Sequence, residues 1–116
     1  MRKTLLAAGM GLMALPAAAE DYDITDLAGS LSRESCVARA RKVLNAYVAE
    51  WGGGDVNTGD WAIYGWDLRP GDQDVVFLCL AEDGDNARAV LVVHGGTDDP
   101  EATRNTADRL VEIWDR

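Results

Sequence analysis

The sequence has very few side chains that bind transition metals. It contains one histidine, two cysteines and three methionines, and all the methionines lie within residues 1–19. A zinc site of the usual His/Cys kind, or a thioether copper site, would therefore find almost no ligands in the remainder of the chain. We expect no metal site and no cofactor.

Positive charge is also scarce. The chain has 11 Lys and Arg against 20 Asp and Glu, for a net charge of −9, and without residues 1–19 the net charge is −11. Binding to nucleic acid or to anionic lipid needs cationic contacts. The composition therefore predicts neither a nucleic-acid partner nor adhesion to a membrane surface.

Residues 1–19 have the pattern of a secretory signal peptide. Arg2 and Lys3 precede an apolar run over residues 4–15, and Ala17-Ala18-Ala19 provides a small-residue cleavage site before Glu20. The apolar run is shorter than the roughly 20 residues that span a bilayer. We expect cleavage after residue 19 and a periplasmic or secreted protein with no membrane anchoring.

The two cysteines, Cys36 and Cys79, are predicted to form a disulfide. Export places them in an oxidising compartment, and they have no other cysteine partner. A closed loop of about 43 residues corresponds to roughly 4 kcal/mol of stabilisation in the chain-entropy model. The pair lacks the C-x-x-C spacing typical of redox sites, so we interpret it as structural.

The remaining sequence predicts one α+β domain over residues 31–116, preceded by an irregular arm over residues 20–30. Apolar residues recur at helical spacing in residues 33–51, and Ser32 is a suitable N-cap. Three strands are expected at residues 61–68, 74–81 and 88–94, followed by a helix over residues 100–114. The predicted fold is helix, three-stranded antiparallel meander, helix.

The middle strand is apolar on both faces. Val75, Phe77, Cys79 and Ala81 share one face, which should receive the first helix because Cys79 must meet Cys36. If the opposite face were exposed to water, its residues should be polar, but they are apolar. Its cover is the C-terminal helix, the aromatic side chains, or another protein chain. The candidate interaction face consists of Val76, Leu78, Leu80, Tyr64 and Trp66.

A second candidate site lies where the third strand ends. His94 precedes two glycines and a predicted helix N-terminus, and Asp98 or Asp99 could orient it as a base or help it hold a ligand. No serine lies in a Gly-x-Ser-x-Gly elbow. The acidic stretch at residues 82–86 lacks the remaining ligand positions of a calcium loop and is interpreted as a hairpin turn.

The expected order of elements over residues 31–94 is similar to that of the secreted PepSY-type domains. The chain differs from their pattern in its disulfide and its second helix, and no motif residue carries over. The resemblance implies a role in peptidase inhibition or regulation. With the composition, it favours a non-enzymatic interaction module that binds another protein or itself, as an inhibitor, accessory or subunit. The alternative is a small hydrolase or ligand-binding protein that uses His94 and the Gly95–Asp99 turn.

Overall fold

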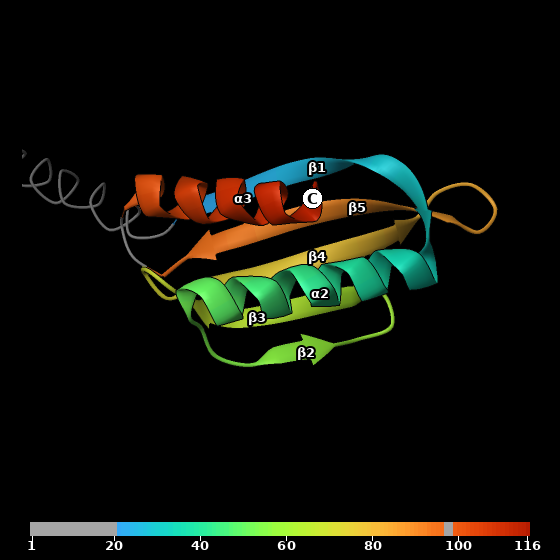
Figure 1. Ribbon diagram of the computed structural model, residues 1–116. Helices are drawn as coiled ribbons and strands as arrows, with labels where there is room; N and C mark the ends of the chain where they lie inside the picture. Colours follow the sequence, from blue (N-terminus) through green and yellow to red (C-terminus); the bar gives the residue numbers. More distant parts are fainter. Residues whose placement is uncertain (1–20, 97–98) are drawn as a thin grey trace, which may run out of the picture.

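The structure is a computed structural model that describes residues 21–96 and 99–116, with only the backbone of residues 28–30. Its elements are β1 (Asp21–Ser32), α2 (Arg33–Trp51), β2 (Val56–Thr58), β3 (Ala62–Leu68), β4 (Gln73–Ala81), β5 (Asn86–Gly95) and α3 (Pro100–Trp114) (Figure 1). The predicted signal peptide, residues 1–19, lies outside the described residues.

The strands form one antiparallel sheet in the order β1-β5-β4-β3-β2. The α+β class is confirmed, but the predicted three-stranded meander is wrong, because the sheet has five strands. The three expected strands are its centre, and β2 and β1 are added at its two edges.

The two missed strands have weak sequence patterns. The segment predicted as an irregular arm is mostly β1, which pairs with β5 from Asp21↔Gly95 to Ser32↔Asn86. Its inward positions include the polar Asp23 and Thr25, and only Tyr22 and Ile24 on the outward side alternate with them, so the apolar pattern is short and lies on the exposed side. β2 has only three residues, of which Asn57 and Thr58 are exposed. In both cases the backbone N–H and C=O groups pair with the neighbouring strand, and this pairing forms the strand although its own sequence does not predict one.

Both helices begin and end where the sequence predicts. The Ser32 side chain caps α2 by accepting a hydrogen bond from the Ser35 backbone N–H at 3.0 Å. After α2, Gly52 has φ of 100°, a conformation that glycine adopts without strain. Asp99 caps α3, and Pro100 occupies its first turn.

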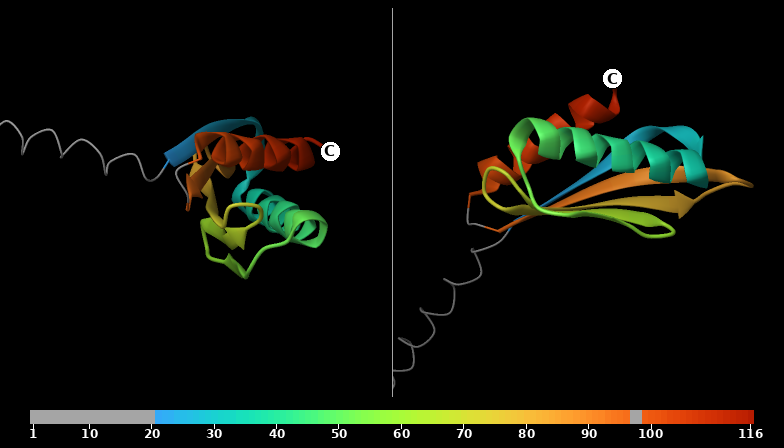
Figure 2. Two further views of the ribbon diagram at one scale, coloured as in Figure 1. Left: turned by 90° about the vertical axis from the view of Figure 1, so that its left-hand side faces the viewer. Right: turned by 60° about the horizontal axis from the view of Figure 1, so that its bottom comes forward.

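Both helices pack on the same face of the sheet (Figure 2). α2 is attached to β4 by the Cys36–Cys79 disulfide, with a Cα–Cα distance of 5.9 Å, so the predicted staple and the predicted side for this helix are confirmed. α3 packs on that same side, because Trp114 stacks on Phe77 with ring centroids 5.6 Å apart. Of the three covers considered for the other face, the C-terminal helix is therefore excluded.

The core lies between this face and the helices. β4 contributes Val75, Phe77 and Cys79, and β5 contributes Leu91 and Val93, all nearly or fully buried. β3 approaches α2 closely at Gly65, where a Cβ atom would lie 2.9 Å from Leu44 Cδ2. The pairing with β4 also shifts register between Gly65 and Leu68.

We predict that replacing both cysteines, as Cys36→Ala with Cys79→Ala, lowers the free energy of unfolding by about 4 kcal/mol. The sequence separation is 43 residues, and opening this loop restores chain entropy to the unfolded state. Urea denaturation of both proteins, with and without dithiothreitol, measures the difference. Reductant should destabilise the wild type and leave the double variant unchanged, and equal curves for all four samples would contradict the prediction.

Candidate functional site

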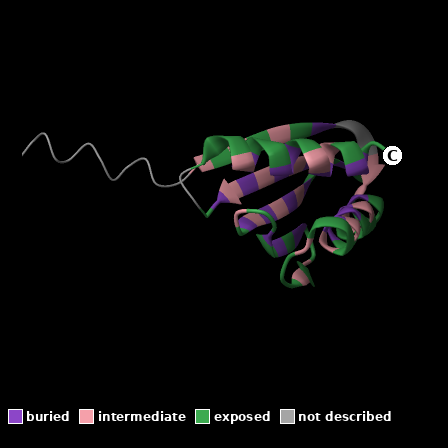
Figure 3. Ribbon diagram, turned by 60° about the vertical axis from the view of Figure 1, so that its left-hand side comes forward, coloured by how far each residue is buried: buried purple, intermediate pink, exposed green. Residues whose placement is uncertain are grey.

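The opposite face of the sheet is uncovered by any described element. Strand alternation places one set of side chains against the helices and the other set outward, and the strands in Figure 3 accordingly show bands of buried and half-buried residues. We call the outward set the open face. It comprises Tyr22, Ile24 and Asp26 of β1; Arg88, Val90, Val92 and His94 of β5; Asp74, Val76, Leu78 and Leu80 of β4; and Tyr64 and Trp66 of β3.

A row of paired residues crosses the open face from the edge strand β1 to β3, which lies next to the other edge strand, β2. Ile24 pairs with Val92, Val92 with Val76, and Val76 with Tyr64. Val90 and Leu78 extend the apolar area to one side of this row. Several of the large apolar residues are well exposed, up to 69% for Ile24 and 62% for Tyr22.

All five residues of the predicted interaction face lie on the open face. Val76 and Leu78 are half-buried between neighbouring strands, and Leu80, Trp66 and Tyr64 are exposed. Sequence reasoning missed the contributions of β1 and β5. The alternation of Tyr22 and Ile24 with polar residues was the signal, but it is too short to identify a strand alone.

The size of the open face sets what it can bind. Strands lie about 4.8 Å apart and successive outward residues about 6.8 Å apart, so the apolar area is on the order of 300 Å². Apolar patches of roughly 300–600 Å² are the largest on a typical monomer and are often functional. An interface of standard size buries about 800 Å² per partner, so a partner must also contact the charged ends of the face.

At one end of the open face, opposite charges from the chain itself meet. Arg88 Nε lies 3.3 Å from Asp26, and Arg88 Nη1 lies 3.7 Å from Glu82. These side chains are about half exposed. Exposed pairs of this kind contribute about 0–1 kcal/mol each, so they mark the boundary of the apolar area more than they stabilise the fold.

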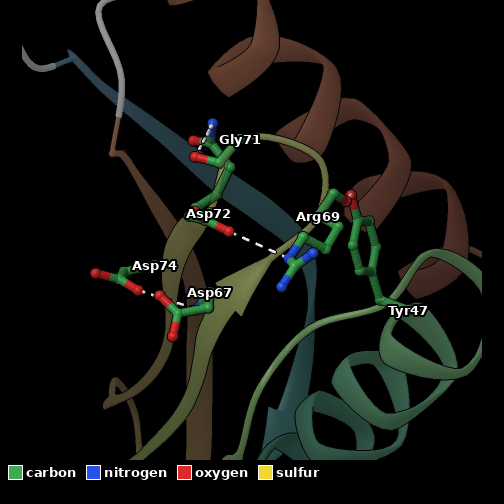
Figure 4. A network of polar contacts seen from close by, with 7 residues as sticks. Tyr47, Asp67, Arg69, Gly71, Asp72 and Asp74 are labelled. Atoms are coloured by element: carbon green, nitrogen blue, oxygen red, sulfur yellow. Dashed lines mark hydrogen bonds and ion pairs between the residues drawn. The ribbon is translucent and has the colours of Figure 1, made fainter.

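The other end is acidic and aromatic. Asp67 and Asp74 lie next to each other, and the Asp67 backbone N–H donates to Asp74 Oδ1 at 3.1 Å (Figure 4). Beside them, the Tyr64 and Trp66 rings stack with centroids 6.0 Å apart. The indole N–H of Trp66 donates to Asn57 Oδ1 at 2.8 Å, which fixes the orientation of the ring.

The residues of the predicted His94 site are only partly placed together. His94 lies on the open face, where its ring stacks on Tyr22 at 4.5 Å and where it pairs in register with Asp74. Asp99 caps α3 by accepting from the Glu101 and Ala102 backbone N–H groups. Asp98 lies outside the described residues. His94 is thus part of the open face, with Tyr22 and Asp74 as neighbours.

A hollow lies elsewhere, between α2 and α3. This groove of about 500 Å³ is lined by Arg39, Lys42, Val43, Ile113 and Trp114, among others. Arg39 is already engaged there, because it donates to the Trp114 carbonyl and lies 4.4 Å above the Trp114 ring. The apolar residues of its floor are nearly fully buried, so a ligand would gain little from covering them.

No group of three or more His, Cys, Asp or Glu side chains within residues 21–96 and 99–116 is arranged to hold a metal ion. In the same residues, no helix has the length and apolar character needed to cross a membrane.

No protein-family model, curated protein or solved structure matches the chain. The resemblance to PepSY-type domains stays a prediction. The resemblance depends on the predicted order of elements, and the observed order differs from it, because β1 precedes α2 and β2 precedes the three expected strands.

We predict that hydroxyl-radical footprinting of the purified protein oxidises Tyr22, Tyr64 and Trp66 readily. These rings are exposed on the open face, whereas Phe77 on the opposite face is fully buried and should stay protected. Mass spectrometry of the oxidised peptides measures the rates. Protection of Tyr64 and Trp66 to the level of Phe77 would show that the face is covered.

Proposed function

We propose that the protein acts by binding another protein through the open face, without catalysis, as an inhibitor, accessory or subunit. The observation that supports this proposal most directly is that both helices pack on one side of the sheet, while an apolar row crosses the other side from β1 to β3. The residues on a sheet face that is exposed only to water are normally polar.

We also propose that the binding takes place in the periplasm or outside the cell. The Cys36–Cys79 disulfide supports an oxidising compartment. The signal-like pattern of residues 1–19 supports export. In that compartment the disulfide attaches α2 to β4, which stabilises the strand at the centre of the open face.

We predict that Val76→Asp abolishes partner binding while the fold survives. Val76 lies in the middle of the apolar row, and a carboxylate buried there without a partner costs several kcal/mol, so binding should fall at least 30-fold. The measurement is affinity capture from an extract of the protein's own compartment after mild cross-linking, with quantification by mass spectrometry. Circular dichroism checks that each variant is folded.

Two controls define this experiment. Asn45→Asp adds the same negative charge on the exposed side of α2 and should capture as much partner as the wild type. His94→Ala, at the border of the open face, should reduce capture only slightly. Capture that survives Val76→Asp but is lost in His94→Ala would instead favour the alternative of a ligand-binding or hydrolytic site at His94.

A further inference from the structure

The tryptophans of this chain differ in whether an arginine lies over the ring. Three of the four have an arginine of the same chain above the ring: Arg33 lies 4.4 Å from the Trp61 centroid, Arg39 lies 4.4 Å from Trp114, and Arg109 lies 3.9 Å from Trp51. Among the described residues, Trp66 has no such cation above it.

The Trp66 ring is nevertheless accessible to a cation from a partner, which would desolvate the ring on binding. This ring is 43% exposed and is held in place by Tyr64 and by the hydrogen bond to Asn57. A cation on an aromatic ring gains about 0.5–1 kcal/mol when exposed and about 2 kcal/mol when desolvated. The carboxylates of Asp67 and Asp74 at the same end of the face also attract a cation.

The nearby cations of the chain have other contacts. Arg69 pairs with Asp72 at 3.1 Å, beside the Asp67 and Asp74 pair (Figure 4). Arg88 pairs with Asp26 and Glu82 at the far end of the open face. His94, opposite Asp74 in the register, stacks on Tyr22.

We infer that the partner is a basic protein that places an arginine side chain on Trp66, at the end of the open face that also carries Asp67 and Asp74. This inference depends on the proposed function, because it names the chemistry of the partner at one end of the same face. Arginine fits better than lysine, since its planar guanidinium stacks on an aromatic ring and donates two parallel hydrogen bonds to a carboxylate. A second copy of this chain is disfavoured by the net charge of −9 on each molecule.

The test begins with a defined probe. An unbiased phage-displayed library of random peptides is selected on the immobilised wild-type protein and depleted on Val76→Asp. The peptides that remain bind the open face. We expect them to combine apolar residues with at least one arginine, and we expect replacement of that arginine by citrulline, its neutral isostere, to weaken binding about tenfold.

The variants then locate the arginine. In Trp66→Leu, and separately in Asp74→Asn, the arginine and citrulline peptides should bind within about twofold of each other. Asn at position 74 can still accept the hydrogen bond from the Asp67 backbone. In the matched control Trp61→Leu, which removes a ring that Arg33 already covers, the tenfold difference should persist.

Each other outcome overturns a specific part of the argument. Peptides that bind the open face without arginine, or whose arginine effect persists in both Trp66→Leu and Asp74→Asn, would overturn this inference and leave the proposed function standing. A dimer in sedimentation velocity that Val76→Asp disrupts would show that the occupant is a second copy. A failure to find any peptide that discriminates Val76→Asp from the wild type would overturn the proposed function as well.

Discussion

The attachment of both helices to one face of β4 determines the rest of the structure. Cys79 holds α2 through the disulfide, and Phe77, two residues earlier on the same face, stacks on Trp114 of α3. Side chains alternate along a strand, so these two contacts together direct Val76, Leu78 and Leu80 away from the core. The open face is thus a consequence of where the helices are anchored.

Much of this arrangement could be predicted from the sequence, because it depends on local periodicity and on one covalent pair. The helical spacing of Cys36, Ala40 and Val43 gave the extent and the buried side of α2, and Cys79 identified the face on which it packs. The side on which α3 packs could not be predicted. Val75 and Phe77 are no more apolar than Val76 and Leu78, so the strand pattern admits a helix on either face.

The edges of the sheet and the acidic end of the face were beyond sequence reasoning for a different reason. β1 is specified by pairing with β5 over a long range, and its own inward residues Asp23 and Thr25 hide the strand pattern. The proximity of Asp67 and Asp74 arises from the register shift after Gly65, which no local rule fixes. Such features depend on tertiary contacts that the chain makes only once it has folded.

The energetics of the open face explain why its charged ends matter. Burying an apolar area on the order of 300 Å² at about 25 cal/mol per Å² yields roughly 7 kcal/mol, which lies within the estimated 4–15 kcal/mol that association costs in lost translational and rotational freedom. In the proposed interaction the apolar area alone would therefore give only weak binding, and contacts at the charged ends would supply the affinity and the choice of partner.

The same charges let the protein tolerate an uncovered apolar surface. A net charge of −9 repels other copies of the chain, and Asp26, Arg88 and Asp74 border the apolar row with groups that are costly to desolvate. A partner of opposite charge meets no such barrier, because its cations offset the desolvation of the carboxylates. Charge thus opposes self-association, and under the proposed function the same residues favour a basic partner. An open face and a strongly acidic composition are therefore compatible in one small domain.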